Sequence, residues 1–143
     1  MIIIFLFSAK PAVSSAESSR TIANAVLNIA ENFMDPAQWQ EDRDNVLDTV
    51  DHIVRKTAHF MEYAILASAI ELHYWITKRK GIRFILLSIL FSFLYAATDE
   101  FHQLFVPGRS GEFKDVMIDT VGAAAGAFLF HFLLILIEHI KRK

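Results

Sequence analysis

The sequence predicts an all-α membrane protein: three full transmembrane helices, a short truncated N-terminal helix and an amphipathic outer segment. Of the 143 residues, 54% are hydrophobic and 13 are phenylalanine, which is more apolar than a soluble domain of this size requires. Two apolar runs, at 81–97 and 116–137, approach or exceed the roughly 20 residues that cross a hydrocarbon core about 30 Å thick. A third run at 57–76 is long enough but carries Glu62 and Glu71. We treat 1–143 as one membrane domain.

The chain starts with an apolar stretch, 1–8, that is too short to span a bilayer as a helix. It lacks the basic start and the longer apolar region of a signal peptide. Three interpretations remain open: a half-helix packed on the bundle, an interfacial anchor, or the end of a first transmembrane helix whose beginning is missing. We favour the last, because it gives an even number of spans and a cytoplasmic N-terminus.

The next segment, 9–56, is acidic and predicted to be extracytoplasmic. The small polar residues of 8–19 indicate a loop. From Ser19 onward, apolar residues recur at helical spacing, which predicts an amphipathic helix suited to a membrane surface (Ile22, Val26, Ile29 and Phe33). Asp35 and Pro36 end that helix, since proline cannot continue one. A second periodic stretch starts near Asp42; whether it runs without a break into the next helix is left open.

Transmembrane helices are predicted at 57–76, 82–101 and 116–138. Basic residues crowd the short link at 78–83 and the end at 141–143, and both should be cytoplasmic by the positive-inside tendency. Alternation then places 9–56 and the polar stretch 98–120 on the extracytoplasmic side of a multi-pass protein in the bacterial cytoplasmic membrane. The chain has no cysteine, so disulfides and thiolate chemistry are excluded.

Three polar clusters lie at the outer ends of the three predicted spans. On the first, Arg55, His59 and Glu62 share a helical face beside Lys56 and Tyr63. The second and third consist of residues at the end of one span and the start of the next (Asp99, Glu100, His102 and Gln103, then Arg109, Asp115 and Asp119). Burying unpaired ions is costly, so these groups must pair, take up protons or hold a ligand.

The last span also indicates how its carboxylates are oriented. Asp115, Asp119, Gly122 and Gly126 are spaced four, three and four apart, so they share one face with the small residues of GAAAG. Small residues spaced in this way let membrane helices approach closely. The two carboxylates should therefore point into the bundle.

Two stretches, RKTAHFMEYAIL and ATDEFHQLFVPGRSGEFKDVMIDTVGAAAG, resemble the VanZ-like family of small bacterial membrane proteins. The FSAKP segment and the serines after it also match the family's usual beginning, which follows one more complete helix. The resemblance implies a cell-envelope protein, since the family's founder is associated with teicoplanin resistance, and it names no established reaction. It points to ten polar positions: Lys56, His59, Glu62, Asp99, Glu100, His102, Gln103, Arg109, Asp115 and Asp119.

Two interpretations of the polar positions compete. In the structural one, the charges only lock three helices together in a non-enzymatic scaffold. In the functional one, which we favour, intramembrane ionisable residues mark a site. Catalytic roles would fall to five residues (His59, Glu62, Asp99, His102 and Asp119), and six others would bind the ligand (Arg55, Lys56, Glu100, Gln103, Arg109 and Asp115).

The ligand of such a site would be an anionic, lipid-linked envelope precursor, because cations grip phosphate or carboxylate by charge-assisted hydrogen bonds. A histidine held by a carboxylate would act as the acid or base. A divalent metal is the alternative cofactor, although three nearby cations would repel it. The expected surroundings are the lipid bilayer, with no nucleic-acid partner. His131, within the last span, is expected to be a hydrogen-bonded bundle residue.

Overall fold

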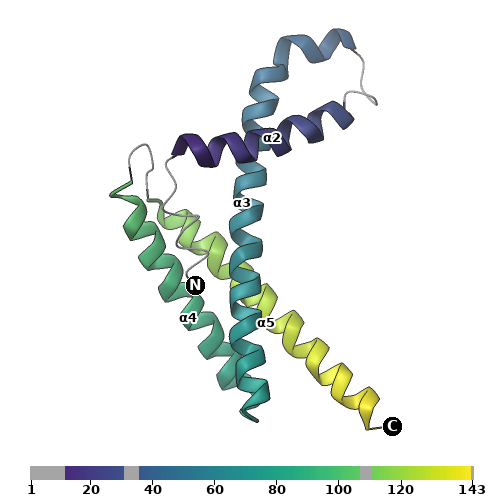
Figure 1. Ribbon diagram of the computed structural model, residues 1–143, viewed down its shortest axis with the longest axis vertical. Helices are drawn as coiled ribbons and strands as arrows, with labels where there is room; N and C mark the ends of the chain where they lie inside the picture. The colour runs from purple at the N-terminus through teal and green to yellow at the C-terminus, as the bar shows by residue number, and fades with distance from the viewer. Residues whose placement is uncertain (1–11, 31–35, 107–110, 143) are drawn as a thin grey trace.

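The computed structural model describes residues 12–30, 36–106 and 111–142, with side chains described for 19–29, 43–106 and 111–142. These residues form four helices, α2 (Ala12–Ala30), α3 (Pro36–Ile76), α4 (Ile82–Gln103) and α5 (Phe113–Lys141), as Figure 1 shows. The predicted all-α class is therefore confirmed for the part of the chain that is described. The short N-terminal helix predicted at 1–8 lies outside it.

The longest element is α3, a single unbroken helix of 41 residues. At 1.5 Å per residue it is about 60 Å long, about twice the thickness of a hydrocarbon core. The amphipathic stretch does run directly into the predicted span at 57–76. It begins at Pro36, however, earlier than the expected start near Asp42, since proline is well tolerated in the first turn of a helix.

The N-terminal half of α3 projects beyond the bundle and carries α2 across it (Figure 1). Ala23 and Leu27 of α2 are buried against Leu47 of α3. The side chains of Arg20 and Asp48 form an ion pair at 3.0 Å on the same interface. These contacts stabilise α2, since short isolated helices are marginal in water.

The boundaries and the packed face of α2 differ from the sequence prediction. The helix begins at Ala12, so residues 12–18 are helical and not the expected loop. Alanine and serine are compatible with a helix that has a partner to pack on. Within α2, Ile22, Val26 and Ile29 remain exposed by 53%, 46% and 64%. The predicted apolar stripe therefore faces away from the protein.

Two of the described helices, α4 and α5, are long and apolar enough to cross a membrane, against three predicted spans. Their outward faces are strongly apolar; Phe91, Phe128 and Phe132, for example, are each about half exposed or more. A soluble protein rarely exposes an apolar surface of that extent. The α3 helix does not reach the same mean hydropathy, because the stretch 57–76 carries Glu62 and Glu71.

The bundle is centred on the crossing of α3 and α5, which run in the same direction (Figure 1). A Cβ built on Gly122 would lie 2.3 Å from the carbonyl oxygen of Phe60, and one on Gly126 would lie 2.2 Å from that of Ala64. Only glycine permits this approach. The predicted orientation of the GAAAG face into the bundle is thereby confirmed.

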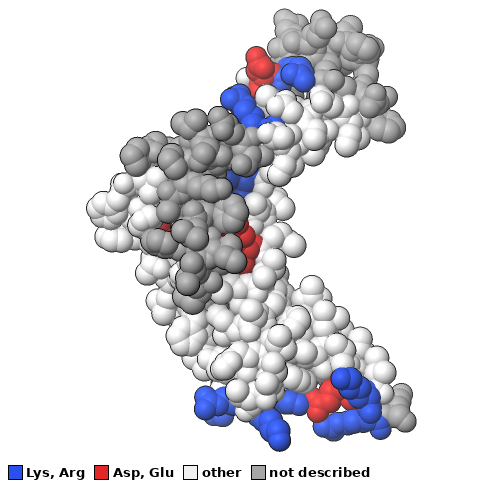
Figure 2. Space-filling model, viewed as in Figure 1, with Lys and Arg blue, Asp and Glu red and all other residues white. Residues whose placement is uncertain are grey.

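The connection between α3 and α4 gathers cations at one end of the molecule, called here the basic end. Lys78 has a positive φ of 59° and Gly81 one of 115°, and these two residues reverse the chain within a few positions. Figure 2 shows Lys and Arg side chains collected at this end, around a small acidic patch. The polar clusters lie at the opposite ends of α4 and α5 and along the middle of α3.

Candidate functional site

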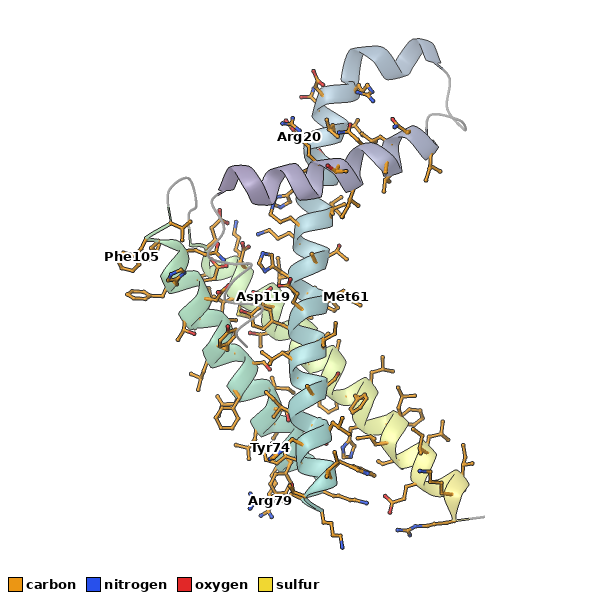
Figure 3. The ribbon with its side chains drawn as sticks, viewed as in Figure 1. Arg20, Met61, Tyr74, Arg79, Phe105 and Asp119 are labelled. Carbon is orange, nitrogen blue, oxygen red and sulfur yellow. The ribbon has the colours of Figure 1, made fainter. Side chains whose placement is uncertain are left out.

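The centre of the candidate site is a set of buried polar side chains between α3, α4 and α5. Asp99, Glu100 and Gln103 of α4 are 3%, 6% and 5% exposed, and Asp119 of α5 is 1% exposed. Tyr63 of α3 is fully buried beside them and interacts electrostatically with Asp99 and Asp119. Figure 3 shows Asp119 inside the bundle, whereas Met61 points away from it. We call these five residues the acidic floor.

Two carboxylates of the acidic floor are held by local hydrogen bonds. The Gln103 amide donates to Asp99 Oδ2 at 3.3 Å, one helical turn away. The backbone N–H of Glu112 donates to Glu100 Oε2 at 2.9 Å. Gly111 packs on the carbonyl of Glu100, where a Cβ would lie 2.4 Å from the oxygen. The start of the α5 segment is thus tied directly to the end of α4.

Other polar atoms of the acidic floor have no hydrogen-bond partner among the described residues. They are Asp99 Oδ1, Asp119 Oδ1 and the Tyr63 hydroxyl. An unsatisfied buried polar group costs about 1–3 kcal/mol, and more when it is charged. A closed structural network would satisfy these atoms. Toward the described residues, the two carboxylate oxygens therefore remain available as acceptors, and the Tyr63 hydroxyl as a donor or acceptor.

The cations predicted to bind a ligand form the rim of the site. Lys56 of α3 is paired with Asp115 of α5, and both side chains are about one-fifth exposed. Arg55 turns toward α2 and pairs with Asp51 at 2.7 Å. Of the predicted cations, Arg109 lies outside the described residues. The structure therefore brings Lys56 and Asp115 together and directs Arg55 one turn away from the acidic floor.

The Asp51 carboxyl is the anchor between α2 and α3. Burial by itself raises its pKa, but hydrogen bonds from Ser19 and Arg55, and the charges of Arg55 and Arg20, outweigh burial and hold the pKa below its usual value. Asp51 is 8% exposed. In the sequence Asp51 is only one residue of an acidic segment, since its partner Ser19 lies on another helix.

The two predicted histidines lie at the edge of the acidic floor. His59 Nδ1 is 3.9 Å from Glu62 Oε2, and both side chains are partly exposed. His102 is partly buried next to Gln103. At 3.9 Å, His59 and Glu62 are within ion-pair distance but too far apart for a hydrogen bond. Within the described ranges, no three His, Asp or Glu side chains are arranged to hold a metal ion.

A second buried polar group lies toward the basic end. His131 Nδ1 of α5 lies 2.6 Å from Glu71 Oε1 of α3, and Glu71 is fully buried. Ser88 of α4 donates to Glu71 Oε2 at 3.4 Å. The prediction that His131 is a hydrogen-bonded bundle residue is confirmed. The partner could not be predicted, because 60 residues separate the two in sequence.

Comparison with known proteins gives one family match. A family model described as VanZ/LLP1 matches residues 1–135. No curated protein and no solved structure matches the chain. With nearly the whole sequence covered by the family model, the chain belongs to the VanZ/LLP1 family.

Proposed function

We propose that this protein is a multi-pass envelope protein of the bacterial cytoplasmic membrane that binds or modifies an anionic lipid-linked molecule. The acidic floor and its rim would form the site, on the extracytoplasmic face. By occupying or altering such a molecule, the protein would lower susceptibility to glycopeptides such as teicoplanin. The observation that carries the proposal is that no described residue donates a hydrogen bond to one buried oxygen each of Asp99 and Asp119.

The division of the site into two parts favours a ligand with two kinds of group. At the rim, Lys56 is partly exposed and supplies a cation suited to a phosphate or carboxylate. At the acidic floor, Asp99 and Asp119 offer acceptors to hydroxyl or amino donors. A lipid-linked sugar phosphate carries both kinds of group in one molecule. His59, with Glu62 beside it, would supply the acid or base if a bond is made or broken.

The proposal includes α3 as a third span, in addition to α4 and α5. Glu71 of α3 is fully buried, while Met61, Ile65, Leu72 and Ile76 are exposed by 38% to 70%. The helix thus turns its carboxylate inward and its apolar side chains outward, as a membrane helix does. The cations of the basic end would then be cytoplasmic by the positive-inside tendency. Labelling of an introduced cysteine at Ser110 from the outside would test this sidedness.

The alternative function is a scaffold in which the polar cluster is a structural network. Its supporting observations are the Lys56–Asp115 and Arg55–Asp51 pairs, each of which joins two charges without a ligand. The two proposals differ in what they expect from the unpartnered atoms. A scaffold gains nothing from an unsatisfied Asp119, so an isosteric neutral side chain there should be harmless or stabilising.

The substitution Asp119→Asn distinguishes a ligand-binding site from a structural scaffold. Susceptible Gram-positive cells would express the protein or the variant, and the minimal inhibitory concentration of teicoplanin would be measured. A binding site predicts that Asp119→Asn loses protection while the protein remains folded and abundant in the membrane. The matched control is Asp48→Asn, which removes an equally charged group whose side chain is 72% exposed on the α2–α3 interface.

Full protection by a folded Asp119→Asn variant would refute the site and support the scaffold. A lipid-resolved mass spectrum of cells with and without the protein would identify the ligand class. A lipid-linked species whose amount or modification depends on Asp119 supports the proposal directly. An unchanged spectrum combined with retained protection would exclude modification and binding at this site.

A further inference from the structure

A separate cavity lies between α3 and α5 at the basic end, far along both helices from the acidic floor. Its volume is about 380 Å³. At this end α5 diverges from α3 beyond their crossing (Figure 1). The polar side chains that line it come from both helices and from the segment after α3: Trp75, Lys80, His131, Glu138, His139 and Arg142. We call it the basic-end pocket.

The inner wall of the basic-end pocket is formed by His131, which Glu71 holds in place. The hydrogen bond between His131 Nδ1 and Glu71 Oε1 occupies one ring nitrogen. Nε2 is therefore the nitrogen that His131 can present to a ligand. The imidazole and the Trp75 indole are nearly perpendicular, at 83°, with ring centroids 5.6 Å apart. A fixed ring at the base of the pocket means that little conformational entropy is lost on binding.

The mouth of the pocket has more positive than negative charge. Lys80 Nζ lies 2.5 Å from Glu138 Oε2, and an Arg142 nitrogen lies 2.6 Å from Glu138 Oε1. Two cations thus share one carboxylate, which leaves a net positive charge at the mouth. Lys80 also lies over the Trp75 ring, 4.0 Å from its centroid. Figure 2 shows further Lys and Arg side chains gathered at the same end.

We propose that the basic-end pocket binds the phosphate headgroup of an anionic phospholipid from the adjacent leaflet. Basic pockets between membrane helices at the headgroup level bind such lipids. Lys80 and Arg142 would grip the phosphate by charge-assisted hydrogen bonds, with His131 as a further donor. Next to the pocket, α5 exposes Phe132 and Leu136, by 63% and 43%, along which acyl chains can lie. A soluble anion would have no use for this apolar surface.

This inference rests on the membrane placement of α4 and α5 and is independent of the outer site. Its test uses Trp75, which lines the pocket, as a reporter. The chain has one other tryptophan, Trp39, and a Trp39→Phe background makes Trp75 the sole indole. The protein would be reconstituted in phosphatidylcholine vesicles that contain a small fraction of brominated lipid. The brominated lipid would be either phosphatidylglycerol or phosphatidylcholine.

The expected result is stronger quenching of Trp75 by brominated phosphatidylglycerol than by brominated phosphatidylcholine at equal mole fraction. In Arg142→Gln the preference should fall, and the fold should persist because the Arg142 side chain is 76% exposed. Lys141→Gln is the matched control: it removes the same charge one residue away, at an exposed position that does not line the pocket. It should retain the preference.

Equal quenching by the two brominated lipids would overturn the proposal, since it would mean that only bulk lipid reaches Trp75. An equal loss of preference in Lys141→Gln and Arg142→Gln would also overturn it, because surface charge alone would then explain the result. Inorganic phosphate added as a competitor distinguishes a soluble anion: if it abolishes the preference, the pocket is not a lipid site. None of these outcomes depends on teicoplanin protection.

Discussion

The close crossing of α3 and α5 can be tested with a single methyl group. In Gly126→Ala the new Cβ would lie 2.2 Å from the Ala64 carbonyl oxygen, whereas ordinary contacts begin at 3.4 Å. The helices must therefore separate by about 1.2 Å (3.4 minus 2.2), because the obstacle is backbone and no rotamer change relieves it. Overpacking of this kind costs about 1–3 kcal/mol.

The assay is unfolding of the purified protein by sodium dodecyl sulfate, followed by circular dichroism or tryptophan fluorescence. Gly126→Ala should lower the transition midpoint. Ala125→Leu is the control: it adds a larger side chain at a neighbouring exposed position and should change stability by less than about 0.5 kcal/mol. When Gly126→Ala is already present, adding Gly122→Ala should lower the stability by less than Gly122→Ala does in the unmodified protein. The reason is that one separation of the helices relieves both contacts.

The reasoning would be refuted if Gly126→Ala unfolded at the same detergent concentration as the unmodified protein. It would also be refuted if Ala125→Leu were equally destabilised, because the effect would then come from side-chain volume on α5 in general. Either result would mean that α3 and α5 are not in backbone contact at Ala64.

Two further predictions concern buried charges. First, His131→Leu leaves Glu71 without its ring partner and should lower the free energy of unfolding by about 3–5 kcal/mol. The double change, Glu71→Leu with His131→Leu, should lower it by clearly less than the sum of the two single changes. Detergent unfolding of the four proteins measures the coupling, with the exposed His73→Leu as control, and additive effects would contradict it. Second, because the folded-state pKa of Asp51 is lowered, its stabilising contribution is present above the usual value of 3.8 and is lost as the pH falls through the lowered pKa. The distance between spin labels on two introduced cysteines, one in α2 and one in α3, should increase under acid. Asp51→Asn should remove this pH dependence. An unchanged distance under acid would argue against Asp51 as the anchor between the two helices.

The sequence by itself determined the helical class and the apolar spans. Apolar runs of bilayer length predict helices at 82–101 and 116–138, and the structure has helices over Ile82–Gln103 and Phe113–Lys141. Helical periodicity also predicted that Asp119, Gly122 and Gly126 share an inward face, and all three are buried. These features are local, since they depend on residues within a few turns of one helix.

Pairing between helices was decided only by the tertiary structure. Periodicity shows which residues share a face, but the partner on another helix depends on register and crossing angle. The contact of Gly126 with the Ala64 backbone fixes both for α3 and α5. That register places His131 on Glu71 and Lys56 on Asp115, pairs separated by 60 and 59 residues.

The same reason explains the unfilled acceptors of the acidic floor. The sequence predicted that carboxylates from different helices lie at one depth, and it required them to pair, take up protons or hold a ligand. Only the packed bundle decided which oxygens were satisfied: Glu100 receives a backbone N–H, while one oxygen each of Asp99 and Asp119 receives none from the described residues. Satisfaction of a buried polar atom depends on angles and distances to groups on several helices, which no spacing within one helix encodes.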